Sequence, residues 1–307
     1  MHLNLVQIQT TSYCNARCDI CPYKDSWMIK NPGVMSLKDY EDVLRKVSEA
    51  DESFSGKVCP YLMNEPFTDK YLDKRIYLIY KYLPNAEVEI STNAELMKGS
   101  LMKRVIDTIK SHNKNPLTKI KVSLHGSSID EISNLMHIDG NTAVKNTVEM
   151  LKYNDGNIPV VLVGLGQSRD EQIRLFNYRK LNRFWHRILE ENNVNRRNVR
   201  ILYYSFHNRA GNVEYSGWNY PKKIREIGPS NPFDCPRIHG RLHILWNLDV
   251  LLCCMDYNHE YCLGNLKDSS VEELLESEQC QTIYKMVRGE IESPEDFICK
   301  RCMSPGG

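Results

Sequence analysis

The 307-residue sequence lacks several features that mark membrane, secreted and nucleic-acid-binding proteins. No stretch approaches the ~20 consecutive apolar residues that a membrane-spanning helix needs. Residues 1–10 lack the basic start and the apolar core of a signal peptide. The net charge is +1, so no strong attraction to nucleic acid or to a membrane surface is expected. We therefore expect a cytoplasmic protein with no nucleic-acid partner and no membrane partner.

Cysteine, by contrast, is abundant, with eleven residues in the chain. Because no export signal accompanies them, metal-bound thiolates in a reducing cytoplasm fit their clustering better than disulfides do. Cys14, Cys18 and Cys21 form a C-x3-C-x2-C run. So tight a loop can offer three thiolates to one compact metal centre and leave one coordination position open.

A second group of cysteines follows residue 234 and contains seven of the eleven. Cys299 and Cys302 form a C-x2-C pair near the end of the chain. Two distant thiolates, Cys235 and Cys253, complete a four-ligand set with this pair. Cys254 is the alternative to Cys253. Four thiolates suit either an iron–sulfur cluster or a structural zinc ion.

Alternating strand and helix patterns fill residues 1–212. The expected strands cover residues 3–9, 57–62, 87–91, 119–124, 158–165 and 200–206. Helical patterns lie between them, at residues 36–50, 70–83, 96–111, 129–153 and 170–190. Repeated strand–helix units predict a parallel sheet with right-handed crossovers.

The pattern changes after residue 212. Residues 213–234 are rich in Gly, Pro and Asn and indicate a linker. A hairpin is expected at residues 242–252 and a helix at residues 270–286. A region this small needs a metal or another staple to be stable.

Polar residues lie at or just after the ends of three of the expected strands. Asn64 and Glu65 come after the second, Ser91 and Asn93 lie at the end of the third, and Ser123 lies at the end of the fourth. Parallel folds bind ligands at the carboxyl ends of their strands. The alternative is ordinary turn and capping chemistry, for which Ser and Asn are common.

Together, the cysteine loop after the first strand and the order of the later cysteines resemble the radical S-adenosylmethionine (SAM) superfamily. The carboxyl-terminal region resembles the shortened auxiliary-cluster domain, called twitch, which is a truncated SPASM domain. The resemblance implies an α/β fold with a partial (β/α)6 barrel over residues 1–212, a linker over 213–234, and a small domain of β-hairpin and helix over 235–307. It also implies two [4Fe–4S] clusters, the second fully ligated by Cys235, Cys253, Cys299 and Cys302. A full SPASM domain needs further cysteines, and here the sequence has none after Cys302.

The resemblance assigns the SAM contacts as well. The open iron held by Cys14, Cys18 and Cys21 would chelate SAM, and Ile20 would pack against the adenine. Asn64 and Glu65 look like a variant of the family's Gly-Gly-Glu turn, which receives the SAM amino group. The carboxylate and ribose contacts would come from Ser91, Asn93 and Ser123. The sequence departs from the family at Met63-Asn64, which replaces two glycines, and at Asn247-Leu248-Asp249, which replaces Asp-Gly.

By the same resemblance, reduced SAM yields a 5′-deoxyadenosyl radical that abstracts a hydrogen atom from the substrate. The outcome is dehydrogenation, with the auxiliary cluster taking an electron, or epimerisation, with Cys254 returning a hydrogen atom. Because little chain precedes Cys14, we expect a small natural product such as a sugar or aminocyclitol rather than a leader-guided peptide. Epimerisation or crosslinking of a ribosomally made peptide is one alternative, and a zinc-stabilised non-catalytic binding protein is another. A flavodoxin or ferredoxin is the expected electron donor.

Overall fold

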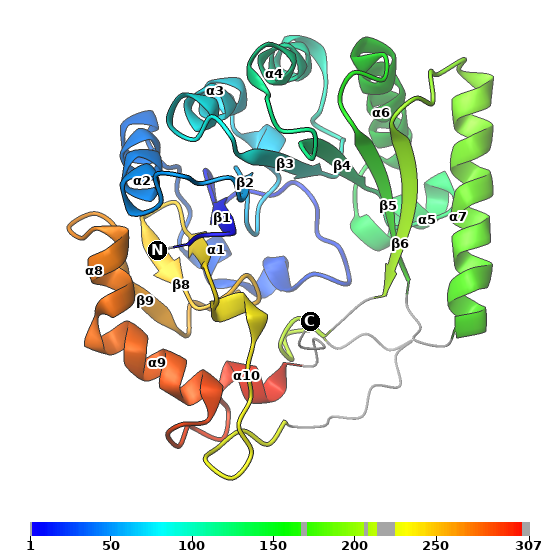
Figure 1. The fold of residues 1–307 in the computed structure, drawn as a ribbon. Helices are drawn as coiled ribbons and strands as arrows, with labels where there is room; N and C mark the ends of the chain where they lie inside the picture. Colours follow the sequence, from blue (N-terminus) through cyan, green and yellow to red (C-terminus); the bar gives the residue numbers. More distant parts are fainter. Residues whose placement is uncertain (1, 167–170, 206–207, 214–224, 303–307) are drawn as a thin grey trace. The chain divides into compact units, whose positions relative to one another are not determined.

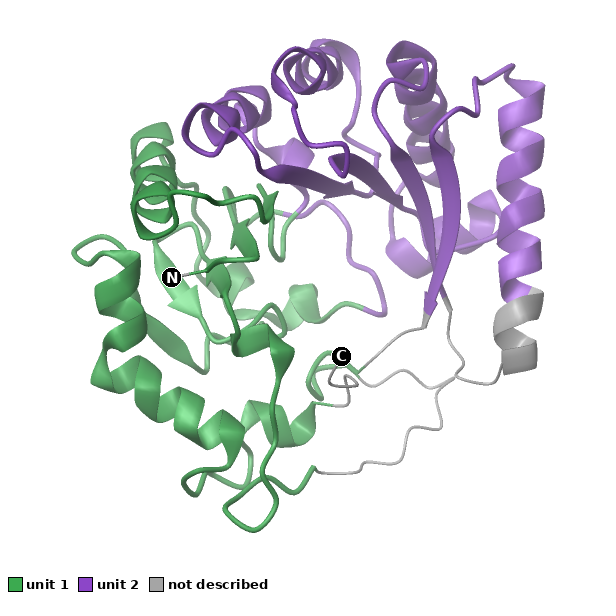
Figure 2. Ribbon diagram, in the orientation of Figure 1, with its two compact units in different colours: residues 1–13, 21–64, 207–307 green, residues 14–20, 65–206 purple. Residues whose placement is uncertain are grey.

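The computed structural model describes residues 2–166, 171–205, 208–213 and 225–302. The chain forms two compact units, which Figure 2 shows in different colours. Unit 1 comprises residues 1–13, 21–64 and 207–307, and unit 2 comprises residues 14–20 and 65–206. The domain boundaries expected at residues 212 and 234 are not addressed by this division and stay a prediction.

Unit 1 contains a mixed sheet with the strand order β2-β1-β7-β8-β9. β1 pairs in parallel with β2 and with β7, and β8 continues the sheet antiparallel to β7 and β9. The strands are β1 (Leu5–Ile8), β2 (Lys57–Cys59), β7 (Arg241–Ile244), β8 (Asp249–Leu251) and β9 (Cys262–Asn265). The expected hairpin is thus present as β7 and β8. β9 was not expected, because its four residues, Cys-Leu-Gly-Asn, show little apolar alternation.

Three helices of unit 1, α2, α8 and α9, begin after serine residues whose hydroxyls cap them. The Ser36 hydroxyl accepts a hydrogen bond from the Asp39 amide at 2.9 Å and starts α2. The single helix expected over residues 270–286 is two helices, because Ser277 ends α8 and its hydroxyl caps α9. The helices are α1 (Trp27–Lys30), α2 (Leu37–Ala50), α8 (Val271–Glu276), α9 (Glu278–Arg288) and α10 (Ile298–Arg301).

Unit 2 contains a parallel sheet with the strand order β3-β4-β5-β6. The strands are β3 (Glu87–Thr92), β4 (Lys119–Ser123), β5 (Val160–Gly166) and β6 (Val199–Ser205). Helices α3, α4, α6 and α7 lie along one side of these strands in Figure 1. The helices are α3 (Leu72–Tyr82), α4 (Gly99–His112), α5 (Ile129–Met136), α6 (Gly140–Asn154) and α7 (Glu171–Glu191).

The strand–helix alternation matches the pattern in the sequence, with local differences. The helical stretch expected over residues 129–153 is interrupted after Met136, where His137 takes a left-handed backbone with φ of 52°. Asp139 then caps α6 by accepting a hydrogen bond from the Thr142 amide. β2 ends at Cys59, three residues earlier than expected. Phe206, the expected end of the sixth strand, lies outside the described residues.

No helix in the described part of the chain is long and apolar enough to cross a membrane.

Candidate functional site

The first cysteine loop is held in unit 2 by the carboxyl end of α5. The Arg17 amide donates to the Met136 carbonyl at 3.1 Å, and the Asp19 amide donates to the Leu135 carbonyl at 3.0 Å. The Arg17 guanidinium also donates to the Cys14 carbonyl at 2.7 Å. These bonds fix the backbone between Cys14 and Ile20 in one conformation. Cys14, Cys18 and Cys21 are all partly exposed, as thiolates that meet an incoming group should be.

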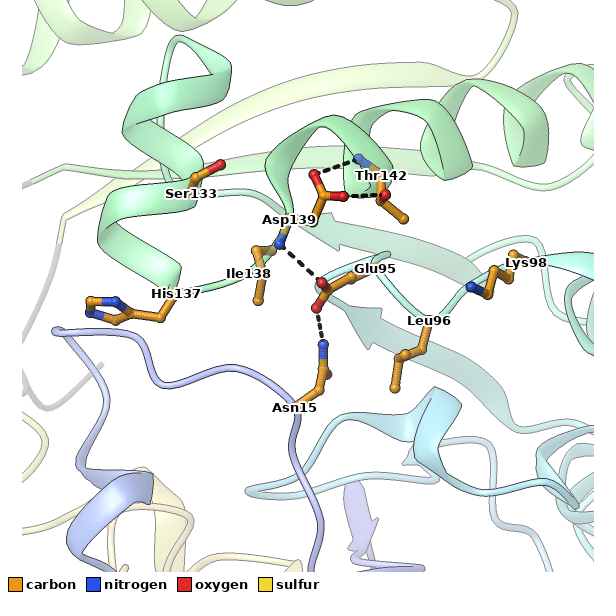
Figure 3. Close-up of a pocket in the computed structure, with 9 residues that line it drawn as sticks. All are labelled: Asn15, Glu95, Leu96, Lys98, Ser133, His137, Ile138, Asp139 and Thr142. Atoms are coloured by element: carbon orange, nitrogen blue, oxygen red, sulfur yellow. Dashed lines mark hydrogen bonds between the residues drawn. The ribbon is translucent and has the colours of Figure 1, made fainter.

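Asn15, one residue after Cys14, connects this loop to the segment after β3. Its amide group donates to the Glu95 carboxylate and its amide oxygen accepts from the Asn93 side chain at 2.9 Å. Figure 3 shows Glu95 between Asn15 and the backbone nitrogen of Asp139, which donates to it at 2.9 Å. Asn15, Glu95 and Asp139 line an open cavity of about 700 Å³ beside the loop. Sequence reasoning missed Asn15 and Glu95, because the pairing joins residues 80 positions apart.

Glu65 is buried and fully hydrogen-bonded. Its carboxylate accepts from the Phe67 amide at 3.1 Å, the Thr92 hydroxyl at 2.6 Å and the Asn93 amide at 2.8 Å. Burial raises the pKa of Glu65 to about 7, although the three donors act in the opposite direction. Glu65 therefore fixes residues 65–67 against the end of β3.

Two further predicted SAM contacts lie together at the ends of β3 and β4. The Ser91 and Ser123 hydroxyls are 3.1 Å apart and share one hydrogen bond. A hydroxyl pair of this kind keeps lone pairs and a donor for another polar group. Ile20 has an exposed fraction of 3%, so it can offer only a small apolar contact surface.

Asn64 belongs to unit 1 and stabilises its own turn. Its side-chain oxygen accepts from the Leu62 amide at 3.0 Å. Its side-chain nitrogen is buried and has no partner among the described residues. A buried amide donor without a partner costs free energy until a ligand or water satisfies it.

Among the described residues of unit 1, Gln9 and His243 are further buried side chains of this kind, and sequence reasoning missed both. Gln9 follows β1 and His243 lies on β7, and the exposed fraction of each is 0%. Gln7 is paired with His243 in the sheet, so Gln9, two residues further on, shares its face. The side-chain polar atoms of both residues lack partners in the described part of the chain. Burial lowers the pKa of His243 to about 3, and the nearby charges of Arg237 and Arg241 add to this effect, so the ring is neutral at physiological pH.

The carboxyl-terminal thiols lie close together in unit 1. Burial raises the pKa of Cys299 the most, and the neighbouring Cys235 and Cys302 thiols raise it further. The pKa of Cys253 is raised by burial, then by Cys254 and Cys299. The Met255 amide donates to the Cys253 sulfur at 3.4 Å.

Arg237 supplies positive charge at this cluster of thiols. Its guanidinium donates to the Cys254 sulfur at 3.0 Å. Burial lowers the pKa of Arg237, but Cys254, Cys253, Cys235 and Cys302 raise it by more, so its net direction is upward. Converging thiols, an amide donor to sulfur and a partly buried cation suit an anionic metal–thiolate centre. The residues present therefore fit a four-thiolate group.

Tyr257 contacts Cys21, the last cysteine of the first run, and both residues belong to unit 1. Its phenol oxygen lies 3.7 Å from the Cys21 sulfur, within the distance accepted for a hydrogen bond to sulfur. Burial raises the pKa of the Tyr257 phenol, and Cys21 raises it further. The phenol therefore stays protonated and can donate to a Cys21 thiolate.

Comparisons with known families agree with these features. A sequence model of the Radical SAM superfamily matches residues 8–178, and a model of the SPASM iron-sulfur cluster-binding domain matches residues 235–303. A curated relative is the S-adenosyl-L-methionine-dependent 2-deoxy-scyllo-inosamine dehydrogenase of Niallia circulans, 28% identical over 94 residues. That match covers 31% of this chain and 36% of the relative, so it spans about a third of the relative's length.

Solved structures show the same fold at low sequence identity. BtrN in complex with AdoMet and 2-DOIA superimposes with a TM-score of 0.58 at 16% identity, covering 99% of this chain and 94% of BtrN. Native anSMEcpe with bound AdoMet and the Cp18Cys peptide superimposes with a TM-score of 0.60 at 15% identity, covering 97% and 88% of the two chains. The expected α/β fold is confirmed. The chain belongs to the radical SAM superfamily and carries a carboxyl-terminal SPASM iron–sulfur domain.

Proposed function

We propose that this radical SAM enzyme dehydrogenates a small, hydroxyl- or amine-bearing natural product of the sugar or aminocyclitol type. When bound, the clusters and SAM supply the one-electron chemistry that removes a hydrogen atom from the substrate. The residues of the chain bind and orient these groups and exclude water. The single observation that carries the proposal is the converging set of four partly buried thiols with Arg237 beside them, which suits an electron-accepting auxiliary cluster.

The ligand assignment follows from the two cysteine groups. Cys14, Cys18 and Cys21 would hold the cluster that binds SAM. Cys235, Cys253, Cys299 and Cys302 would hold the auxiliary cluster, giving two [4Fe–4S] clusters per chain. Two contacts support Cys253 over Cys254 as the ligand: Cys253 takes an amide hydrogen bond from Met255, and Cys254 takes one from Arg237.

SAM would lie at the strand ends. Ser91, Asn93 and Ser123 would hold its ribose and carboxylate groups, and Ile20 would contact its adenine. The amino group would meet the turn at Asn64 and Glu65. The three hydrogen bonds that Glu65 accepts support a role in holding this turn in place.

The substrate class is supported by the dehydrogenase relative and by the polar side chains of unit 1. A hydroxyl or amine that reaches Gln9 and His243 would satisfy donors and acceptors that lack partners in the described residues. A peptide substrate is the second candidate, because the anSMEcpe structure with the same fold contains a bound peptide. We propose a flavodoxin or ferredoxin as electron donor, a cytoplasmic location, and domain boundaries at residues 212 and 234.

Dehydrogenation is favoured over epimerisation by the surroundings of Cys254. A thiol that delivers a hydrogen atom must present its S–H group to the substrate. The Arg237 guanidinium can only donate hydrogen bonds, so the Cys254 sulfur acts as the acceptor at 3.0 Å. This hydrogen bond holds the Cys254 side chain against Arg237 and limits its rotation toward a substrate.

The proposal is tested by the mass of the product. The cluster-loaded enzyme is incubated with SAM, a reductant and a panel of aminocyclitols and sugars. We expect a product two mass units lighter than its substrate, since dehydrogenation removes two hydrogen atoms. Epimerisation would be established instead by a product whose mass equals that of the substrate in ordinary water and which gains one deuterium in deuterated water. That product should also be lost in Cys254→Ala. SAM cleavage stimulated only by peptides would favour the second substrate class.

A further inference from the structure

Three side chains outside the proposed catalytic machinery converge in the carboxyl-terminal part of unit 1. Asp249 begins β8, Cys262 begins β9, and His259 lies in the loop between these strands. One ligand atom from each lies within 4.8 Å of those from the other two. Carboxylate oxygen, imidazole nitrogen and thiolate sulfur are the donor types that Zn²⁺ binds in proteins. We propose that Asp249, His259 and Cys262 form a binding site for one zinc ion, separate from both clusters and independent of the proposed reaction.

The distances suit a single four-coordinate ion. With zinc–ligand bonds of about 2.0–2.3 Å, tetrahedral ligands lie roughly 3.3–3.7 Å from one another. His259 Nε2 now lies 2.8 Å from the nearer oxygen of Asp249, as a direct hydrogen bond. Metal binding therefore requires this pair to open by less than about 1 Å, which side-chain rotation can supply.

The orientation of the ligands is fixed by neighbouring side chains. The Asn265 amide donates to Asp249 Oδ1 at 2.8 Å, and the Asn247 amide donates to Asp249 Oδ2 at 2.6 Å. The His259 ring stacks on Trp27, with ring centroids 4.5 Å apart. Hydrogen bonds and packing that hold the ligands in place are a regular part of protein metal sites.

The site is also open to solvent and balanced in charge. The side chains of His259 and Asp249 are 21% and 18% exposed, so a water molecule can supply a fourth ligand. One carboxylate and one thiolate neutralise a divalent cation. The Cys262 thiol now donates to the Gly264 carbonyl at 3.3 Å, a weak bond, and on binding zinc it would release its proton to solvent. His259 would release a proton as well, because its hydrogen bond to Asp249 raises the pKa of the ring to about 10 and zinc takes the place of that proton on Nε2.

A simple hydrogen-bonded lock between β8 and β9 is the competing explanation. Asp249 and His259 would suffice for such a lock, and Cys262 would add little, because a thiol is a weak hydrogen-bond donor. The zinc site differs from the lock in one respect that can be measured: its sulfur must bind metal.

The experiment uses the full chain with both clusters loaded. The protein is incubated anaerobically with a small excess of zinc chloride, desalted, and assayed for zinc, iron and sulfide. We expect one zinc ion per chain in addition to the cluster iron. X-ray absorption at the zinc edge should show one sulfur at about 2.3 Å and nitrogen or oxygen ligands at about 2.0–2.1 Å.

Variants then locate the ion. Cys262→Ser and His259→Ala should lose the zinc while they keep iron and sulfide, whereas Cys280→Ser, at a buried cysteine of α9, should keep all three. The absence of bound zinc in the wild type would overturn the proposal. So would four sulfurs around the zinc, because that would place it at the auxiliary thiolates. The wild-type sulfur count decides the matter even where a variant fails to fold.

Discussion

At the residue scale, the Glu65 carboxylate holds residues 65–67 against the end of β3. Each of its three partners donates a hydrogen bond, from Phe67, Thr92 and Asn93. Removing such a carboxylate leaves two backbone amides and a hydroxyl without acceptors, so the turn loses its anchor. Any ligand that depends on this turn should then bind less well.

Glu65→Ala is therefore expected to weaken SAM binding by about ten- to a hundredfold, since a hydrogen bond to a charged group contributes roughly 1.5–3 kcal/mol. Equilibrium binding of SAM to the cluster-loaded protein measures the change, and iron content shows whether both clusters remain. Glu149→Ala, which removes a more exposed carboxylate from α6, is the matched control. Unchanged SAM affinity in the Glu65 variant would remove this residue from the site.

The pKa of Glu65 also predicts how stability depends on pH. Because the pKa in the folded chain is raised from 4.5 to about 7, the folded state binds more protons than the unfolded state between these values. The free energy of unfolding should therefore fall as pH rises from 4.5 to 7, by roughly 3 kcal/mol at most from this group. Denaturant titrations at pH 5 and pH 8 should show this loss in the wild type and a smaller one in Glu65→Gln. Equal losses in both would contradict the assignment.

Arg237 gives a second residue-scale prediction. A cation and a donated hydrogen bond beside the thiolates favour the more negative, reduced form of a cluster. Arg237→Gln should therefore lower the midpoint potential of the auxiliary cluster, by the order of 50–100 mV for one charge-assisted hydrogen bond. A redox titration followed by electron paramagnetic resonance measures it. Lys285→Gln removes a surface charge from α9 and should leave the potential unchanged; equal shifts in both variants would count against a local effect.

At the element scale, a buried ion pair fixes the segment between Glu65 and α3. The Arg75 guanidinium on α3 donates to Asp69, and the exposed fractions of the two side chains are 0% and 2%. Asp69 also accepts from the Tyr71 amide at 2.9 Å. A buried charge left without its partner is costly, because no water replaces the lost contact.

Asp69→Ala and Arg75→Ala should each lower the free energy of unfolding by about 3–5 kcal/mol. The double variant should lose much less than the sum of the two, since no unpaired charge remains. Arg104→Ala breaks the more exposed pair with Asp73, where Arg104 is 49% exposed, and should cost less than about 1 kcal/mol. Additive losses at Asp69 and Arg75 would show that they do not act as a pair.

Most helices and strands, but not all, can be predicted from local patterns in the sequence. Apolar periodicity located α2 and the six strands of the parallel pattern, because this signal is local, although β2 ends three residues earlier than expected. β9 and the break at Ser277 were missed. The strand Cys262–Asn265 is defined by its pairing with β8, which is not encoded in four residues alone. Ser277 interrupts a continuous helical pattern through its own capping bond.

At the scale of the whole molecule, the spacing of the cysteines is enough to indicate the family and to suggest the cluster ligands. Spacing cannot show which side chains surround a ligand. Arg237 beside Cys254, Tyr257 beside Cys21, and Gln9 on the same sheet face as His243 all depend on contacts between distant segments. The sequence therefore predicts the cofactor chemistry well, whereas the environment that tunes it and selects the substrate requires the fold.

The central claim is that one chain holds two [4Fe–4S] clusters, one of them on an incomplete set of three thiolates. Iron and acid-labile sulfide analysis of the anaerobically reconstituted protein tests it most directly. Two four-iron clusters should give about eight iron atoms and about eight sulfides per chain. The triple variant Cys14→Ala, Cys18→Ala, Cys21→Ala should keep about four of each. A protein that holds zinc without sulfide, or a triple variant that keeps the wild-type iron content, would contradict it.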